Sequence, residues 1–275
     1  MNLKKLIELL KKYIYKTYLL FIWYLILFYH YLEKSQLRIH KNIITISKSS
    51  KRDIIRHYKV NEEKIKIIPN GVDLDKFNPK NYSKAVREKY GNKILLYSGL
   101  MVERKNIPVL LKAFRHVIKE LPDVRLILTG KGPYLDDYKE LSKSLNIQKK
   151  AYFLGFVSDK ELLKLLATSD IFVFPSELEG FGQVIMESFA SGTPVICSDI
   201  PPMADIIEDA GKTFKPGDPK DLAMKIIELF EDNKLHQGLV KKTVKVAEKY
   251  KWSNIAREYQ NYIKNVIKSK QDKNN

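Results

Sequence analysis

Two carboxylates lie eight positions apart in the run Ser176–Glu187, on either side of a glycine-containing turn. The run follows an apolar segment, Ile171–Phe174, that is typical of a buried strand, and it continues into a helix-like stretch that ends at Gly192. Glu179 is therefore expected on a turn at the carboxyl end of a strand, where ligands bind in an open parallel sheet. Glu187 is expected about two turns into the following helix. Carboxylates in these positions can accept hydrogen bonds from sugar or ribose hydroxyl groups.

Three backbone amides between these carboxylates can bind an anion. The amides of Phe181, Gly182 and Gln183 fall at the expected start of the helix, where the first N–H groups have no partner within the helix. Free amides in this position favour an anionic group such as a diphosphate. Gly180 and Gly182 would let the backbone approach the ligand closely. The turn therefore predicts a site for a phosphorylated ligand that also carries hydroxyl groups.

Short apolar segments alternate with helix-like segments from residue 42 onward. This alternation predicts right-handed βαβ crossovers and a parallel sheet, which is an α/β fold. The predicted strands are residues 43–47, 65–68, 93–97, 124–128, 152–156, 171–174 and 195–197. The predicted helices are residues 49–57, 107–120, 134–145, 159–167 and 184–190, with two or three amphipathic helices after residue 218.

The first 42 residues have a different composition. Residues 1–16 combine apolar and lysine positions as in a basic amphipathic helix. Residues 17–32 contain no Asp, Glu, Lys or Arg and seven aromatic residues. This segment is slightly shorter than the roughly 20 apolar residues of a standard spanning helix, and its Tyr and Trp residues prefer the membrane interface. Three interpretations stay open: an in-plane membrane anchor, a short spanning helix, and a helix that packs on another protein domain.

Composition limits the class of protein and its partners. A chain of 275 residues with 44% hydrophobic residues can bury a large core, as one large domain or two small ones. The formal net charge of +17 favours anionic partners such as phosphorylated ligands or an anionic membrane surface. No nucleic-acid-binding motif is present, so no specific nucleic-acid partner is expected. The single cysteine, Cys197, lies in an apolar strand segment and is expected in the core, which suits a reducing cytoplasm.

A series of short motifs occurs in order between residues 43 and 262. The motifs are Ile44–Ser47, Ile67–Asp73, Leu95–Gly99, Arg104–Asn106, Leu128–Pro133, Phe153–Val157, Phe174–Ser176, Glu179–Gly182, Glu187, Ser191–Ile196, Asp205, Pro216–Asp218 and Trp252. Each motif is weak alone. In this order, they resemble the C-terminal, nucleotide-sugar-binding half of the family 4 (group 1) retaining glycosyltransferases of the GT-B fold.

The resemblance implies a Rossmann-like donor-binding domain and a role for each matching residue. Lys105 would pair with the diphosphate and stabilise negative charge on the leaving group, while Glu179 would bind donor-sugar hydroxyls. Glu187 would take the ribose hydroxyls, and Arg104 is a weaker candidate for the diphosphate. The other implied donor-binding residues are Gly99, Gly130, Phe156, Val157, Gly180, Phe181, Gly182 and Gln183. Without the resemblance, Lys105 would be an ordinary solvated residue at a helix start; Glu187 could also be solvated, but its spacing from Glu179 favours ligand binding.

The sequence departs from the family pattern at several positions. Many relatives carry an arginine where this chain has Leu100, which removes one phosphate contact unless Arg104 replaces it. Pro201–Pro202 stands where a glycine pair is usual, and Asp205, in place of a glutamate, could bind ligand or begin a helix. The five histidines show no metal-ligand spacing, and neither a metal ion nor another cofactor is expected.

The resemblance also implies a division of the chain. Residues 1–42 would form a helical membrane-surface or docking segment, residues 43–270 the nucleotide-sugar-binding domain, and residues 271–275 a disordered tail. The N-terminal acceptor-binding domain of the family would be largely missing, so a partner protein could supply it. The chain is expected in the cytoplasm, either free or held on or in the cytoplasmic membrane.

These features predict transfer of a hexosyl unit from a nucleotide-diphospho-sugar, with retention of configuration, to an unknown acceptor of lipid-linked or polysaccharide type. A different interpretation is a donor-binding subunit of a split glycosyltransferase that is inactive alone, or an inactive truncated homologue. A nucleotide-sugar epimerase of the same fold is a more remote alternative.

Overall fold

The computed structural model describes residues 23–25 and 28–272. The described residues divide into two compact units. The first comprises residues up to Thr45 together with Ser50–Ile67, and the second comprises Ile46–Ser49 and the chain from Ile68 onward. The predicted amphipathic segment 1–16 and part of the aromatic segment 17–32 lie outside the described residues, so the three interpretations of the N-terminus stay predictions.

The first unit is a small helical and parallel β arrangement. Residues 28–39 are helical and are followed by β1 (Ile43–Thr45), α2 (Lys48–Tyr58), a short 3-10 helix (Glu62–Lys64) and β2 (Ile65–Ile67). The two strands pair in parallel, with Ile43 opposite Ile65, and they share a small apolar core with Val60. Trp23, Tyr24, Phe28 and Tyr29 of the described N-terminal residues are exposed. None of the helices in residues 23–25 and 28–272 has the length and apolar character needed to cross a membrane.

The strands near residue 43 do not join the main sheet. The sequence pattern predicts one domain that begins at residue 43, whereas β1 and β2 form a separate two-stranded sheet within the first unit. The alternation of strand, helix and strand is present as predicted. Periodicity identifies strands, but it contains no information about which sheet each strand enters.

The second unit contains a six-stranded, fully parallel sheet with the strand order β5-β4-β3-β6-β7-β8. Its strands are β3 (Lys93–Ser98), β4 (Val124–Thr129), β5 (Ala151–Gly155), β6 (Ile171–Phe174), β7 (Val195–Ser198) and β8 (Gly211–Phe214). Every residue of β6 and β7 is buried, which explains why these strands are continuous apolar runs in the sequence. The α/β fold with a parallel sheet is therefore confirmed.

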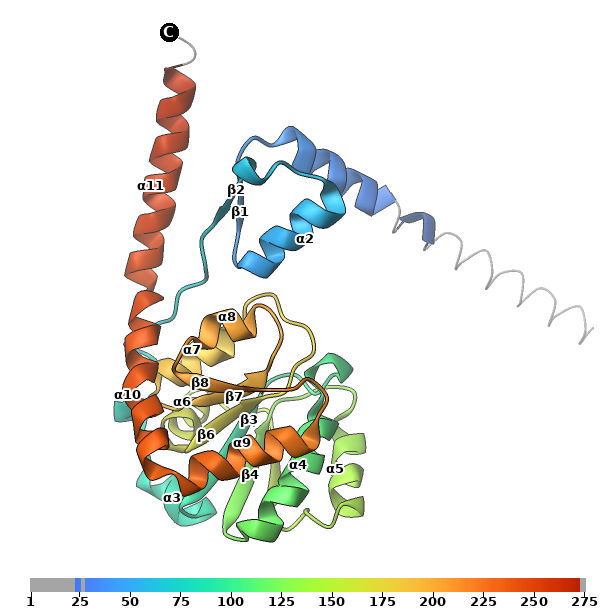
Figure 1. Ribbon diagram of the computed structural model, residues 1–275, viewed down its shortest axis with the longest axis vertical. Coiled ribbons are helices and arrows are strands. Elements are labelled where there is room, and N and C mark those ends of the chain that lie inside the picture. The colour runs from blue at the N-terminus through green and yellow to red at the C-terminus, as the bar shows by residue number, and fades with distance from the viewer. Residues whose placement is uncertain (1–22, 26–27, 273–275) are drawn as a thin grey trace, which may run out of the picture. The chain divides into compact units, whose positions relative to one another are not determined.

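Helices precede, connect and follow these strands, in the βαβ manner between β3 and β8 (Figure 1). They are α3 (Lys84–Tyr90), α4 (Ile107–Glu120), α5 (Leu135–Ser144), α6 (Asp159–Thr168), α7 (Gln183–Ala190), α8 (Met203–Ile207), α9 (Pro219–Glu231), α10 (Asn233–Lys249) and α11 (Trp252–Gln271). Helix α4 packs against α5 and α9, whereas α7 packs against α6 and α10. The chain after residue 218 forms three helices, and Gln271 of the predicted tail still belongs to α11. Residues 273–275 lie outside the described part.

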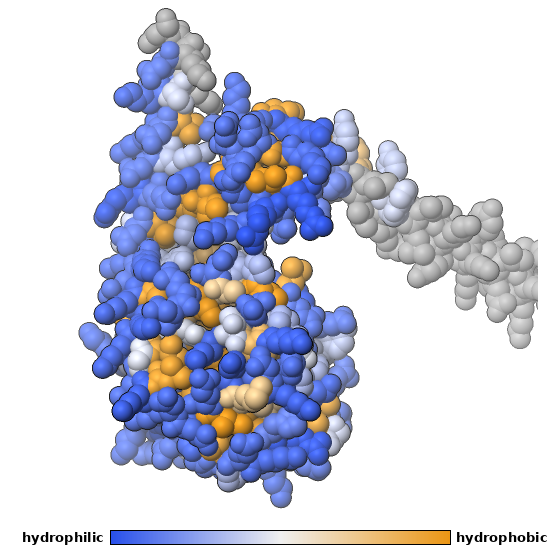
Figure 2. Space-filling model, in the orientation of Figure 1, coloured by the Kyte–Doolittle hydropathy of each residue, from blue (hydrophilic) through white to orange (hydrophobic). Residues whose placement is uncertain are grey.

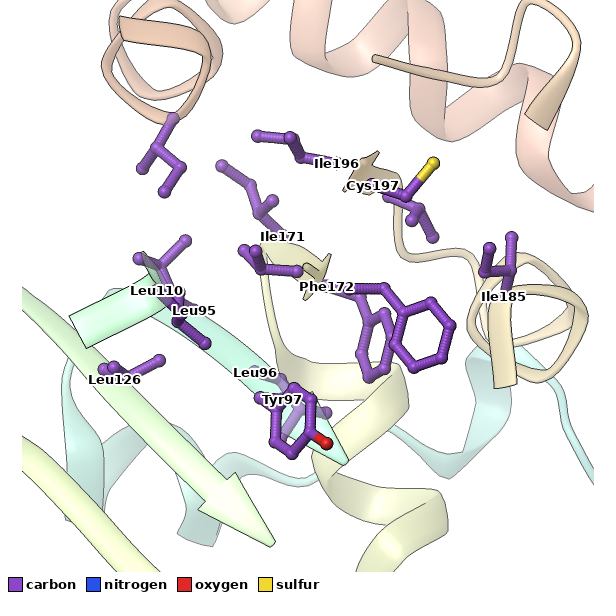
Figure 3. Close-up of a cluster of buried hydrophobic side chains, with 14 of the residues drawn as sticks. Leu95, Leu96, Tyr97, Leu110, Leu126, Ile171, Phe172, Ile185, Ile196 and Cys197 are labelled. Atoms are coloured by element: carbon purple, nitrogen blue, oxygen red, sulfur yellow. The ribbon is translucent and has the colours of Figure 1, made fainter. Parts of the chain in front are cut away.

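Branched and aromatic side chains from the central strands form the core (Figure 3). Leu95 and Leu96 of β3, Phe172 of β6 and Ile196 of β7 are fully buried. Burial of each such side chain contributes about 1.5 to 3 kcal/mol to folding. Cys197 is fully buried among them, as predicted, and burial raises the pKa of its thiol. On the outside, hydrophilic side chains cover most of the face shown in Figure 2.

The chain reverses its direction of sheet growth between β3 and β6. Strands β4 and β5 are added on one side of β3, and β6, β7 and β8 are added on the other side. The loops that follow β3 and β6 therefore leave the sheet toward opposite faces, and the carboxyl ends of these two strands form a switch point of the kind where parallel sheets bind ligands. The predicted site residues Lys105 and Glu179 follow these two strands.

Candidate active site

Lys105 and Glu179 form a largely buried ion pair at this switch point. Lys105 Nζ lies 2.5 Å from Glu179 Oε1, and the two side chains are 9% and 11% exposed. The ammonium also lies over the Phe174 ring, 4.6 Å from its centroid, where a cation is attracted to the π face. Lysine is rarely buried unless it is paired. A buried ammonium at the edge where parallel sheets bind ligands is therefore suited to an anionic ligand that can take over the role of Glu179.

Arg104 adds a second cation to the same carboxylate. Its Nη1 lies 3.3 Å from Glu179 Oε1 and donates to the Leu178 carbonyl over 3.1 Å. The Arg104 side chain is 46% exposed, so it can turn toward a ligand without leaving a buried site. Leu100, where many relatives have an arginine, is exposed. Arg104 is thus placed where it could make the phosphate contact that an arginine at the position of Leu100 makes in many relatives.

The turn after β6 presents free amides at the start of α7. Gly182 is the N-cap of α7 with φ 85°, a left-handed conformation that glycine adopts without strain. Among the described residues, no acceptor lies on the amides of Phe181, Gly182 and Gln183. The Phe181 side chain is buried against Tyr250, with ring centroids 6.0 Å apart, and so it anchors the turn. The amides predicted to bind an anion therefore have no partner in the protein.

Gln183 ties the first turn of α7 to a second loop. Its Nε2 donates to the Gly71 carbonyl over 2.9 Å. Gly71 in turn lies against Trp252, because a Cβ at this position would come within 2.4 Å of the indole ring. The Nε2 group of Gln183 is thus engaged within the protein, while its buried Oε1 atom and its backbone amide have no partner among the described residues.

Three glycines form a row at the carboxyl ends of β3, β4 and β5. Gly99 N donates to the Thr129 carbonyl over 3.1 Å, and Gly130 N donates to the Gly155 carbonyl over 2.7 Å. A Cβ at Gly130 would lie 1.8 Å from the Gly99 carbonyl oxygen, so only glycine fits there. Phe156 and Val157 follow directly, with Phe156 72% exposed and Lys131 Nζ 5.4 Å from its ring centroid. The backbones of these three strands therefore lie close together at their carboxyl ends.

Glu187 lies in α7, apart from the ion pair. Burial raises the pKa of its carboxyl above the ordinary value of 4.5; the Lys76 ammonium opposes this shift and Asp159 adds to it. Lys76 is itself paired with Asp159, Nζ to Oδ2 at 2.7 Å. Among the described residues, the Glu187 carboxylate has no hydrogen-bond partner. A partly buried acceptor without a protein donor is suited to ligand hydroxyl groups.

We expect Glu187→Gln to stabilise the chain at neutral pH. Because the pKa of Glu187 is raised in the folded state, the folded chain binds this proton more tightly than the unfolded chain. Stability is therefore highest below the ordinary pKa and is lost as pH rises through the folded-state pKa. Glutamine does not ionise, so the variant does not lose this stability. In urea unfolding, its free energy of unfolding should exceed that of the parent chain at pH 7, and the difference should disappear near pH 4. Glu231→Gln, on an exposed residue, is the control; an equal gain in both variants would contradict the prediction.

The structure brings together some of the predicted residues and separates others. Lys105, Arg104 and Glu179 meet directly. Gly180, Phe181, Gly182 and Gln183 continue the same turn, and Gly99, Gly130, Phe156 and Val157 lie at the ends of neighbouring strands. Among the described side chains, Glu187 has Lys76 and Asp159 as its charged neighbours, whereas Lys105 pairs with Glu179. Asp205 is exposed in the first turn of α8, after the Pro201–Pro202 pair.

Two polar residues beside the predicted site were missed by sequence reasoning. Asn106 Nδ2 donates to Glu177 Oε1 over 2.7 Å, and Glu177 N donates to the Arg104 carbonyl over 2.9 Å. Asn106 belongs to the motif Arg104–Asn106 and directly follows Lys105, and Glu177 lies two residues before Glu179; this proximity in sequence is the signal that could have found them. In residues 23–25 and 28–272, no three His, Cys, Asp or Glu side chains gather in a way that could hold a metal ion.

Sequence profiles of two families match the chain. The profile described as Glycosyl transferases group 1 matches residues 78–246, and the profile described as Glycosyltransferase Family 4 matches residues 12–76. The first match covers more than half of the chain and contains Lys105, Glu179 and Glu187. Both profiles agree with the resemblance drawn from the ordered motifs.

Individual relatives agree with these profiles. The chain is 32% identical over 232 residues to an uncharacterized glycosyltransferase of Methanocaldococcus jannaschii, a match that covers 81% of this chain and 59% of the relative. It is 37% identical over 166 residues to the alpha-monoglucosyldiacylglycerol synthase of Streptococcus pneumoniae, covering 58% of this chain and 37% of the relative.

A solved structure has the same fold. The Anabaena protein HepE, crystallised in complex with UDP and glucose, superposes with a TM-score of 0.72 at 22% identity, covering 82% of this chain and 62% of HepE. The chain thus spans about three-fifths or less of the length of the relatives that it matches. From the group 1 profile and the identity to the M. jannaschii relative, we conclude that the chain belongs to the glycosyl transferases group 1 family.

Proposed function

We propose that this chain binds a nucleotide-diphospho-sugar and transfers its hexosyl unit, with retention of configuration, to a lipid-linked or polysaccharide acceptor. The observation that carries the proposal is the meeting of Lys105 with Glu179 at the switch point between β3 and β6, in the same turn as the free amides of Phe181 and Gly182. A cation and free amides match a diphosphate, and a carboxylate matches sugar hydroxyls. The UDP and glucose bound by HepE support this ligand class.

In the proposed reaction, the glycosidic bond between the sugar and the diphosphate breaks while the acceptor oxygen bonds to the anomeric carbon, and the acceptor hydroxyl proton passes to an oxygen of the departing diphosphate. Negative charge develops on the departing diphosphate. Lys105, with Arg104 and the turn amides, would stabilise this charge in a partly dry site, where electrostatic interactions are strong. Glu179 would turn from Lys105 to the sugar hydroxyls and fix the orientation of the sugar. This assignment gives no role to a metal ion or other cofactor.

The proposed lipid acceptor is supported by a relative, by the composition of the chain and by exposed aromatic side chains. The relative from S. pneumoniae is named for a glucosyldiacylglycerol product, which supports a lipid acceptor. The basic composition and the exposed Trp23, Tyr24 and Phe28 support peripheral attachment at the anionic, cytoplasmic face of a membrane. A partner protein that completes the acceptor site remains part of the proposal.

Isothermal titration of the chain with UDP, GDP, ADP and the corresponding hexose donors tests the donor site. We expect one nucleoside diphosphate to bind with micromolar to millimolar affinity, about −4 to −8 kcal/mol. Glu187→Ala should weaken this binding about 10- to 100-fold, because a ribose hydroxyl loses its acceptor. Absence of binding by the folded parent chain to all three nucleotides would refute the proposal.

Release of the nucleoside diphosphate from the bound donor, measured with and without acceptor lipids, separates turnover from binding. A chain that binds the donor and releases the nucleoside diphosphate from it in the presence of acceptor lipids is a transferase in its own right. A chain that binds the donor with the expected selectivity but never releases the nucleotide would favour the donor-binding subunit of a split enzyme.

A further inference from the structure

The asparagine after Lys105 does not cap the helix that it precedes. Asn106 is the N-cap of α4 and has φ 47° and ψ 44°, a left-handed conformation that asparagine adopts more readily than most residues. An asparagine at an N-cap usually accepts a hydrogen bond from the first turn of its helix, but the Asn106 side chain makes no such bond. Its amide instead reaches the loop after β6, where Nδ2 donates to Glu177 Oε1 over 2.7 Å.

Glu177 holds both sequence neighbours of Lys105. Its carboxylate accepts the hydrogen bond from Asn106, and its backbone amide donates to the Arg104 carbonyl over 2.9 Å. Lys105 lies between these two fixed points, and its buried side chain points to Glu179. Glu177 itself is exposed. The contact therefore lies outside the ion pair and leaves the Lys105 ammonium in place against Glu179 and the Phe174 ring.

We propose that Asn106 and Glu177 are positioning residues that hold the Lys105 ammonium where the donor diphosphate binds. This inference rests on the proposed function and adds to it two residues that act through Lys105. Lysine has a long, flexible side chain. Once Glu179 turns to the sugar hydroxyls, Lys105 loses its carboxylate partner, and its position depends on the backbone that Glu177 fixes on both sides.

Three variants isolate this hydrogen bond. Asn106→Gly keeps a left-handed backbone available and removes the side-chain amide. Glu177→Ala removes the carboxylate, and Glu177→Gln keeps an acceptor oxygen without the charge. The readout is the ratio of affinities for the nucleoside diphosphate that binds best among UDP, GDP and ADP and for its free nucleoside. We expect this ratio to fall about 3- to 10-fold in Asn106→Gly and Glu177→Ala, the effect of one hydrogen bond.

In Glu177→Gln the ratio should stay within about twofold of the parent value, because the acceptor is kept. Affinity for the free nucleoside should not change in any variant, since Lys105 acts on the diphosphate alone. Asn106→Gly and Glu177→Ala combined should lower the ratio no further than either change alone, because both remove the same bond. Urea unfolding of each variant checks that the chain remains folded.

Matched controls exist elsewhere in the second unit. Asn146 is an exposed asparagine with φ 56°, and Glu231 is an exposed glutamate; Asn146→Gly and Glu231→Ala should leave the ratio unchanged. An unchanged ratio in Asn106→Gly and Glu177→Ala overturns the inference while leaving the donor site intact. A parallel loss of nucleoside affinity also overturns it, because that result indicates general damage. A parent chain that binds no nucleoside diphosphate refutes the proposed function itself, and the inference with it.

Discussion

Lys105→Met is expected to lower the rate of glycosyl transfer by about 10²- to 10³-fold, the effect of removing one preorganised charge-stabilising group from an active site. Methionine keeps an unbranched apolar stem of similar length, so the packing over Phe174 is largely maintained. The diphosphate loses its buried cation, and only the more exposed Arg104 remains. The affinity of the chain for the nucleoside diphosphate that it binds best should therefore fall toward its affinity for the corresponding free nucleoside.

The variant also changes stability, and this effect must be separated from function. Lys105→Met leaves the buried Glu179 carboxylate with Arg104 as its one cationic neighbour among the described residues, and breaking a buried pair destabilises a protein by about 3 to 5 kcal/mol. Lys105→Met combined with Glu179→Gln removes both charges and should recover much of this loss.

Urea unfolding and release of the nucleoside diphosphate from the donor distinguish these effects. The double variant should be more stable than Lys105→Met and equally inactive. Arg104→Ala, which removes the exposed cation, should reduce the rate by less than Lys105→Met. Recovery of activity together with stability in the double variant would show that Lys105 acts on folding rather than on the leaving group.

Burial determined how well the strands could be predicted. Strands β3, β6 and β7 lie inside the sheet and are continuous apolar runs, so their sequence pattern identifies them. Strand β8 was not predicted. It is an edge strand in which Lys212 and Thr213 are only partly buried, and so it needs no apolar run. Helix α8 has five residues, too few for a helical period to be recognised.

Some residues of the candidate site are close together in the sequence, and others are far apart in the sequence and meet only in the fold. Glu179 and the following amides belong to one turn, and their spacing alone predicts a ligand site. Lys105 and Glu179 are 74 residues apart and meet because β3 and β6 are neighbours in the sheet. No local pattern contains this adjacency, and the role of Lys105 was therefore inferred from the family resemblance. The bond between Asn106 and Glu177 depends on the same adjacency and was missed.

Gly130→Ala is expected to destabilise the chain by about 2 to 5 kcal/mol, which combines the strain of a left-handed alanine with forced movement of packed backbone. Gly130 has φ 122°, and its Cβ would lie 1.8 Å from the Gly99 carbonyl oxygen. Gly99 must then move away from Thr129, to which its amide donates, and the carboxyl ends of β3 and β4 must separate. Because the loop that contains Lys105 begins there, binding of the nucleoside diphosphate should weaken as well.

Gly217→Ala separates the two causes of this loss. Gly217 has φ 76° with no atom within 4 Å of its Cβ position, so this variant experiences the backbone strain without the collision. Urea unfolding should show a loss of about 1 to 2 kcal/mol for Gly217→Ala, a larger loss for Gly130→Ala, and unchanged nucleotide binding in Gly217→Ala. If both variants lose the same free energy of unfolding, the backbone at Gly99 and Gly130 can move at little energetic cost. In that case, the close contact between Gly99 and Gly130 does not determine where the Lys105 loop begins.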